Sequence, residues 1–309
     1  MNCPVCNKSN LKQKYKYEKR NEKFLDNNQF INFNNKILTC EDCDLSFNSD
    51  VSIKDLDHFY SKINIIDKQK KIIRQKFSEF NSRFFSQVLY YLQFFKIKKN
   101  CSILEIGPNR YGISKTIKIF EKEINYYYFD AATIEPENKV VKLGDYYYPL
   151  KSKLPKLDLI WMSHSLEHLH PELLVATFRH FHESLDNDGK IFIEIPDELN
   201  PLLKIIIPHT LFFTKQSIYK VFDKLGFSIS SYTEINNKNE KDNLIENNFN
   251  DSFKKNKFDL KKNYFVQAVY LFVQKLVPDK IVKKYVLKNF IKNGPYTNEK
   301  IIRIILKKK

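Results

Sequence analysis

The sequence predicts an α/β protein with a mostly parallel sheet, and three observations lead to this prediction. Residues 102–106 form a short apolar strand, Gly107 opens a permissive turn, and a helix is expected to begin near Ile113. A second apolar run ends at Asp130, 23 positions after Gly107. Further strand-like and helical segments alternate after residue 157, as expected for strands joined by crossover helices.

The turn after the first strand is a candidate nucleoside site. A strand that runs through such a turn into a helix brings free backbone N–H groups close to a ligand. A carboxylate about 20 residues later, here Asp130, is where α/β units hold ribose hydroxyls. The spacing of Gly107, Asn109 and Gly112 also fits a degenerate dinucleotide fingerprint, because Asn visits left-handed conformations readily. A dehydrogenase that binds NAD is therefore one interpretation.

The downstream segments favour a different cofactor. Residues 157–169 have the pattern of a buried strand and a polar helix start, residues 184–196 of a turn and a strand, and residues 209–227 of a loop, a helix and a strand start. The order of four motifs resembles that of the class I S-adenosylmethionine-dependent methyltransferases over roughly residues 100–235. The motifs are Leu104-Glu-Ile-Gly107, the strand-end Asp130, Leu166-Glu-His168 and Leu225-Gly-Phe227. The resemblance implies a Rossmann-like, seven-stranded, mostly parallel sheet with helices on both faces, and S-adenosylmethionine as cofactor.

Four of the five cysteines predict a structural zinc site. They form two pairs, each separated by two residues, so each pair can grip one metal ion from a tight turn: Cys3 and Cys6, and Cys40 and Cys43. A site with four cysteine ligands keeps no open coordination position, so we expect it to do no chemistry. Paired disulfides are the alternative, which a reducing compartment disfavours.

The surroundings of these cysteines suit a zinc ribbon. Asn7 and Asp44 follow the second cysteine of each pair, and both residue types tolerate the positive φ that such turns often need. The 33 residues between the pairs contain strand-like segments at 29–33 and 36–39. The ribbon could orient the acceptor or a partner.

The domain organisation follows from these segments. Residues 77–95 have apolar positions at helical spacing and are expected to pack across the edge of the sheet. Residues 264–291 are again apolar at helical spacing, and residues 300–306 resemble the last, antiparallel strand of a methyltransferase sheet, next to the fifth strand. We therefore predict a zinc ribbon (1–55), a helical linker or cap (56–99), the methyltransferase domain (100–235), a polar segment with a helical insertion (236–296) and the last strand (297–309).

The resemblance implies a set of cofactor contacts. Glu105 would organise the turn, and Gly107 with Asn109 and Gly112 would approach the methionine part. Asp130 would bind the ribose hydroxyls, unless it is an ordinary strand-end acid. The remaining implied contacts are Asp145 to the adenine amino group (or a simple turn at 144–145), Tyr146 beside the ring, and Ser163 and His164 in the sulfur-side pocket.

Two further residues follow from ribbon-bearing sugar methyltransferases, which the chain resembles in its order of ribbon, Phe-Tyr-Ser and methyltransferase domain. Tyr60 would reach the cofactor or acceptor, or else anchor two domains. Methyl transfer depends mainly on positioning, and a base is needed only if the acceptor must lose a proton. His209 is the candidate base, although residues 206–208 lack most of the Tyr-His-Glu-His motif of the sugar C-methyltransferases, and an ordinary loop histidine is the alternative.

The net charge of +16 raises the possibility of a nucleic-acid-binding protein or an RNA methyltransferase. However, the chain has only six arginines, and its lysines are spread along its length, which favours a solvated basic surface. Such a surface would still attract an acidic substrate such as a nucleotide-linked sugar. A basic amphipathic helix in residues 264–291 could instead rest on a membrane surface.

A zinc peptidase is a further alternative, because His164-Ser-Leu-Glu-His168 matches the His-x-x-Glu-His pattern. The segment directly follows a buried strand and has no assignable third ligand, which disfavours it. No secretory signal or membrane-spanning segment is evident, so we expect a cytoplasmic protein. The favoured interpretation is a methyltransferase, with structural zinc, that modifies a sugar or another polar small metabolite for surface glycans.

Overall fold

The computed structural model describes residues 1–17, 22–23, 30–31, 35–54, 56, 82–108, 112–118, 120–130, 139–197, 209–236 and 300–309. Among these residues, no helix combines the length and the apolar character needed to cross a bilayer.

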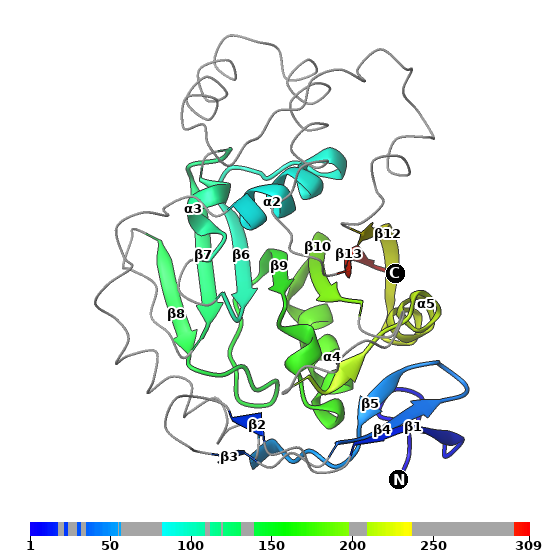
Figure 1. Ribbon diagram of the computed structural model, residues 1–309. Coiled ribbons are helices and arrows are strands. Elements are labelled where there is room, and N and C mark those ends of the chain that lie inside the picture. Colours follow the sequence, from blue (N-terminus) through cyan, green and yellow to red (C-terminus); the bar gives the residue numbers. More distant parts are fainter. Residues whose placement is uncertain are drawn as a thin grey trace, which may run out of the picture.

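The main feature is a seven-stranded sheet with the strand order β12-β13-β10-β9-β6-β7-β8 (Figure 1). From β10 to β8 all neighbours are parallel, whereas β13 is antiparallel to both β10 and β12. This is a Rossmann-like, mostly parallel sheet, so the predicted fold class is confirmed. The strands are β6 (Cys101–Ile106), β7 (Ile124–Phe129), β8 (Val140–Gly144), β9 (Leu157–Ser163), β10 (Leu185–Pro196), β12 (Phe227–Asn236) and β13 (Lys300–Lys308).

The strand order changes direction at β6. The chain first adds β7 and β8 on one side of β6 and then adds β9 and β10 on the other. In open α/β sheets, ligands bind outside the carboxyl ends of the strands at such a switch point. The strand order therefore predicts a binding site at the carboxyl ends of β6 and β9.

Helices cover both faces of this sheet (Figure 1). Side chains alternate along each strand, so Ile103 shares one apolar layer with α2 and α3, and Leu104 shares the other with α4 and α5. Burial on both faces explains why the strands are continuous apolar runs in the sequence. The helices are α2 (Ser82–Phe94), α3 (Ser114–Ile117), α4 (Leu174–Ser184) and α5 (Lys215–Lys224).

The position of α2 corrects one expectation. The helix lies on a face of the sheet and not across its edge, because it shares an apolar layer with Ile103 and Trp161 and makes polar contacts with β10 and β13. Gln87 Nε2 donates to Glu194 Oε1 of β10 at 2.6 Å, and Arg303 Nη1 of β13 donates to the carbonyl oxygen of Ser86 at 3.3 Å. Apolar spacing predicts that a helix forms, but it does not identify the surface that the helix covers.

The last strand occupies the predicted place. In β13, Ile304 pairs with Ile193 of β10 on one side and with Tyr232 of β12 on the other. Residues 237–299, which include most of the expected helical insertion, lie outside the described residues.

The N-terminal sheet has four strands in the order β1-β4-β5-β11, and its last strand comes from the main domain. Leu211 pairs with Phe47 and Phe212 pairs with Ser46. The ribbon therefore does not stand apart: it joins the loop that follows β10, and Figure 1 shows it beside α5. These strands are β1 (Leu11–Tyr17), β4 (Asn35–Cys40), β5 (Ser46–Asn48) and β11 (Leu211–Phe212), and a separate pair is β2 (Glu22–Lys23) with β3 (Phe30–Ile31).

Candidate functional site

Backbone hydrogen bonds connect three strand ends along the carboxyl edge of the sheet. Gly107 N, after β6, donates to the carbonyl oxygen of Phe129 at the end of β7 (2.9 Å). Asp130 N, after β7, donates to the carbonyl oxygen of Gly144 at the end of β8 (3.1 Å). Gly107, Asp130 and Asp145 therefore follow neighbouring strands at one edge, although they are far apart in the sequence.

The turn after β6 needs glycine at its first position. Gly107 has φ +67°, and a Cβ added there would lie 3.3 Å from the Cβ of Ser165, after β9. A side chain would thus face both backbone strain and a close neighbour. Gly112, at φ +51°, closes the turn by donating from its N–H to the carbonyl oxygen of Pro108 (3.2 Å). Asn109 lies outside the described residues.

Glu105 fixes this turn from inside the protein. Its buried Oε2 accepts a hydrogen bond from Ile113 N (2.8 Å), just before α3, and another from the hydroxyl of Tyr126. Burial and the Glu105 charge raise the pKa of Tyr126 well above its usual value, so the hydroxyl stays a donor. The carboxylate therefore connects the strand, the helix start and the neighbouring strand.

The end of the site beyond β8 is more open. The side chain of Asp145 is 63% exposed, and Lys142 Nζ lies 2.5 Å from its Oδ1. The half-buried ring of Tyr146 meets the ring of Tyr148 edge-on at 6.5 Å. Both predicted residues thus lie just after β8, with an exposed carboxylate next to a half-buried aromatic ring. Tyr60 lies outside the described residues.

Ser163 and His164 follow β9 and contact charged groups that the sequence analysis missed. Ser163 Oγ accepts from Gln87 Nε2 at 2.7 Å. His164 has φ +51°, and its Nε2 lies 3.3 Å from Glu194 Oε1, while its Nδ1 lies 3.5 Å from Glu167 Oε1. The imidazole is therefore held between two buried carboxylates.

Glu194 belongs to a buried ionic network. Its Oε2 accepts from Arg303 Nε at 2.7 Å, and both side chains are fully buried. Gln87 donates to its other carboxylate oxygen. A signal for this pair was present in the sequence, because Glu194 and Arg303 are the single charges inside the apolar runs 191–195 and 301–306.

His209 lies against the segment that follows β9. Its ring meets that of His168 edge-on, with the centroids 4.6 Å apart. Thr210 N donates to the carbonyl oxygen of Glu167 (2.7 Å), and Thr210 Oγ1 donates to that of Leu169 (2.6 Å). Burial, with a smaller contribution from His209, lowers the pKa of His168 to about 3, so this imidazole is neutral near pH 7.

The His-x-x-Glu-His segment does not have the geometry of a peptidase. The pattern requires two histidines one turn apart on an α-helix. Here His164 has a left-handed backbone, and Leu166–His168 forms a 3-10 turn, η1. His168 faces His209, which comes from another segment.

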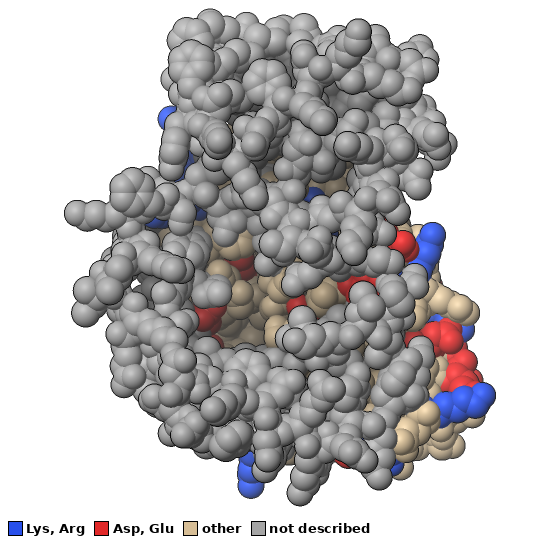
Figure 2. Space-filling view, in the orientation of Figure 1, with Lys and Arg blue, Asp and Glu red and all other residues tan. Residues whose placement is uncertain are grey.

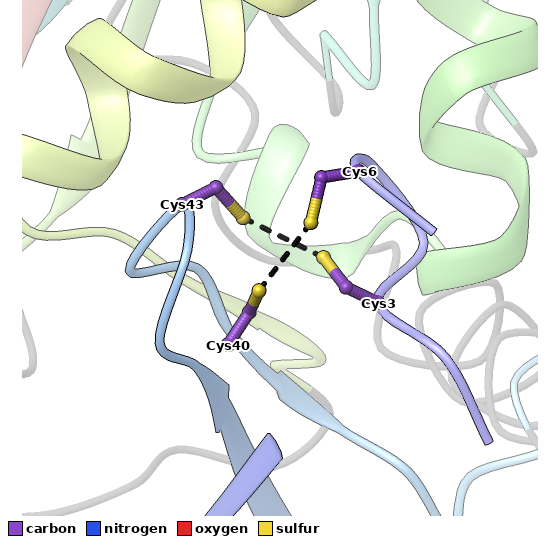
Figure 3. Close-up of side chains that lie close together, drawn as sticks. All are labelled: Cys3, Cys6, Cys40 and Cys43. Carbon is purple, nitrogen blue, oxygen red and sulfur yellow. Dashed lines mark hydrogen bonds between the residues drawn. The ribbon is translucent and has the colours of Figure 1, made fainter. Parts of the chain in front are cut away.

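The four predicted zinc ligands converge in the N-terminal ribbon. Figure 3 shows the four cysteine side chains pointing toward one another; the sulfurs of Cys3 and Cys43 are 3.5 Å apart, and those of Cys6 and Cys40 are 3.4 Å apart. All four are free thiols, and a tetrahedral site with Zn–S bonds of about 2.3 Å would separate its sulfurs by about 3.8 Å. The donor set and its spacing therefore fit zinc.

The turns that carry these cysteines have the predicted backbone. Asn7 has φ +55° and Asp44 has φ +59°, which confirms the expectation for both positions. The N–H of each donates back to the carbonyl oxygen of the first cysteine of its pair, at 3.0 and 2.8 Å. The hydrogen bond between Cys3 and Cys43 lowers the pKa of Cys3 to about 5 and raises the pKa of Cys43.

No protein-family model matches the sequence, and no curated protein matches it significantly. Solved structures resemble it at low identity. The 1,6-didemethyltoxoflavin-N1-methyltransferase of Burkholderia thailandensis has 10% identity and a TM-score of 0.47, and the match covers 87% of this chain and 97% of that one. The complex of the Haloferax volcanii Trm112 methyltransferase activator with a putative methyltransferase has 7% identity and a TM-score of 0.45, and the match covers 83% of this chain and 97% of that one. The [4+2]-cyclase SpnF has 8% identity and a TM-score of 0.44, and the match covers 72% of this chain and 80% of that one.

Proposed function

We propose that this protein is an S-adenosylmethionine-dependent methyltransferase. The observation that carries the proposal is the continuous edge described above, where Gly107, Asp130 and Asp145 follow three adjacent strands connected by backbone hydrogen bonds. A glycine turn before a helix, a ribose-binding acid and an acid near the base are the groups that an adenosyl ligand requires.

Each group has a distinct task in this proposal. The backbone around Gly107 receives the methionine part, because the absence of a Cβ leaves room there. Asp130 accepts hydrogen bonds from the ribose hydroxyls, and Asp145 accepts one from the adenine amino group beside Tyr146. Ser163 and His164 lie next along the edge, on the sulfur side. When bound, the cofactor supplies an electrophilic methyl carbon, so the chain's main contribution is to orient the acceptor.

The acceptor side is formed by the segments after β9 and β10. His209 is the residue that we expect to promote the loss of the acceptor proton, because the loop after β10 carries it toward the segment 164–168. His164 lies at the same edge, between Glu167 and Glu194. These polar groups suit a small acceptor with hydroxyl or amino groups.

The distribution of charge supports a sugar or a similar polar metabolite. Figure 2 shows Asp and Glu atoms in a hollow over the central strands and also at the right-hand margin of that face, where Lys and Arg atoms lie beside them. Carboxylates accept hydrogen bonds from hydroxyl groups and repel phosphates. A nucleotide-linked sugar would thus direct its sugar, and not its phosphates, into the hollow. An extended RNA backbone fits this arrangement less well.

The test has two stages. Calorimetry with S-adenosylhomocysteine and, separately, NAD should show binding of the first compound only. Transfer of an isotope-labelled methyl group should then be screened against nucleotide sugars, free sugars and a structured RNA. Binding of NAD alone, or of neither compound, would contradict the methyltransferase proposal. Labelling of RNA without labelling of any sugar would replace the proposed acceptor class.

A further inference from the structure

A second cluster of metal-binding side chains lies apart from the cysteines. Glu167, His168 and His209 each offer a ligand atom, and these three atoms lie within 4.8 Å of one another. Two of the residues come from η1 and the third from the loop before β11, 41 positions beyond His168. From this geometry we infer that the protein binds a second divalent transition-metal ion through Glu167, His168 and His209.

Burial supports this assignment. Glu167 is 1% exposed and His209 is 7% exposed, so the carboxylate has little access to water. A buried carboxylate is costly unless a positive charge compensates it. A divalent cation between the carboxylate and the two imidazoles would supply the charge.

The groups around the cluster hold it in shape. Thr210, next to His209, donates to the carbonyl oxygens of Glu167 and Leu169 through its N–H and hydroxyl groups. The strand β11 begins at the next residue and pairs with β5, which fixes the loop on its other side. His164 Nδ1 lies 3.5 Å from Glu167 Oε1, where it can orient the carboxylate as an outer-sphere partner. A site fixed in this way needs little rearrangement to accept an ion.

The donor set indicates the class of ion. Two imidazole nitrogens and one carboxylate oxygen suit borderline divalent ions such as Zn²⁺ or Co²⁺. Three protein ligands also leave a coordination position open, unlike the four cysteines. The two sites therefore differ in both ligand softness and function.

The location suggests a role, which rests on the proposed function. The cluster lies close to the proposed cofactor turn. Ser165, two positions before Glu167, is so near that a Cβ added at Gly107 would lie 3.3 Å from the Ser165 Cβ. The ion would hold the acceptor oxygen in its open position and lower the pKa of that hydroxyl group, so that its proton would pass to solvent water as the oxygen takes the methyl group and the thioether leaves. His209 would then promote deprotonation as a metal ligand and not as a free base.

Metal analysis tests the site without any cofactor or acceptor. Protein saturated with Zn²⁺ and then freed of excess ion should contain two equivalents. Glu167→Gln and His209→Gln should each contain one, and so should Cys6→Ser, which loses the ribbon ion. His182→Gln is the matched control for replacing a histidine and should keep two.

The Co²⁺ spectrum distinguishes the two sites where a variant loses stability. Intense thiolate charge-transfer bands should persist in His209→Gln, which would show that the ribbon is intact, and should disappear in Cys6→Ser while weaker bands remain. One equivalent in the wild type, or two equivalents in both Glu167→Gln and His209→Gln, overturns the inference. Two equivalents in a protein that does not bind S-adenosylhomocysteine would refute the methyltransferase proposal and leave the metal site standing.

Discussion

At the scale of single residues, the site depends on backbone positions that most side chains cannot occupy. Gly107 and Gly226 both have positive φ, at +67° and +84°. The first lies at the proposed cofactor turn, and the second lies before β12 beside His182. A substitution at Gly226 should therefore affect stability alone, whereas a substitution at Gly107 should affect both stability and the binding of the cofactor.

Gly107→Ala should lower both stability and cofactor affinity. The left-handed conformation costs an alanine about 1–2 kcal/mol, and the new Cβ would also press on Ser165 at 3.3 Å. Thermal unfolding and calorimetry with S-adenosylhomocysteine measure the two effects. Gly226→Ala should show a comparable loss of stability with unchanged affinity. Equal affinities for Gly107→Ala and the wild type would place the ligand elsewhere.

Asp130→Asn should weaken the binding of S-adenosylhomocysteine about 10- to 100-fold, because a hydrogen bond to a charged group contributes about 1.5–3 kcal/mol. Asp145→Asn is the comparison, since its carboxylate is 63% exposed and already paired with Lys142. We expect its effect to be smaller, because water and Lys142 screen its contribution. A larger loss for Asp145→Asn than for Asp130→Asn would contradict the assigned roles.

At the scale of elements, local patterns predicted what forms, and long-range contacts decided where it lies. The apolar runs of β6, β9 and β13 and the glycine turn were evident because each is a continuous local signal. The pairing of Leu211 and Phe212 with β5 was not, because a two-residue strand has no periodicity of its own. The cluster of His168 and His209 could not be predicted either, because the sequence does not show that the two loops meet.

The buried pair Glu194–Arg303 is the clearest prediction for the elements. It joins β10 to β13, and Arg303 also donates to Ser86 of α2. Arg303→Met leaves the Glu194 carboxylate buried without its cation, so the free energy of unfolding should fall by about 3–5 kcal/mol. Chemical denaturation measures it.

The double variant Glu194→Gln/Arg303→Met should recover much of that loss, since the uncompensated charge is gone. The exposed pair Lys99–Glu123 provides a control, in which Lys99→Met should cost less than about 1 kcal/mol. If Arg303→Met costs no more than Lys99→Met, the network does not hold α2 against the sheet.

At the scale of the whole molecule, the ribbon and the main domain share a sheet at the proposed acceptor side of the site. The ribbon strand β5 pairs with β11, and Asn48 N donates to the carbonyl oxygen of Thr210 at 2.8 Å. Lys220 of α5 pairs with Asp44 of the second cysteine turn at 2.5 Å. The proposed cofactor turn at Gly107 instead follows β6. The ribbon thus supports the loop that carries His209.

Loss of the zinc ion predicted at the four cysteines should therefore reduce the proposed methyl transfer more than cofactor binding. In Cys6→Ser, the turn between β4 and β5 loses its metal ion, and we expect β5, β11 and the neighbouring His209 to shift with it. The segments from Gly107 to Asp145 do not depend on this turn and keep their own backbone hydrogen bonds. We expect the rate of transfer to an identified acceptor to fall at least about tenfold, equivalent to about 1.4 kcal/mol in the barrier, with affinity for S-adenosylhomocysteine changed less than about threefold. Lys12→Ala, which removes an exposed ion pair with Glu41 on the same ribbon, should leave both quantities unchanged. Parallel losses of rate and affinity in Cys6→Ser would instead show that the ribbon supports the whole fold and not the acceptor loop in particular.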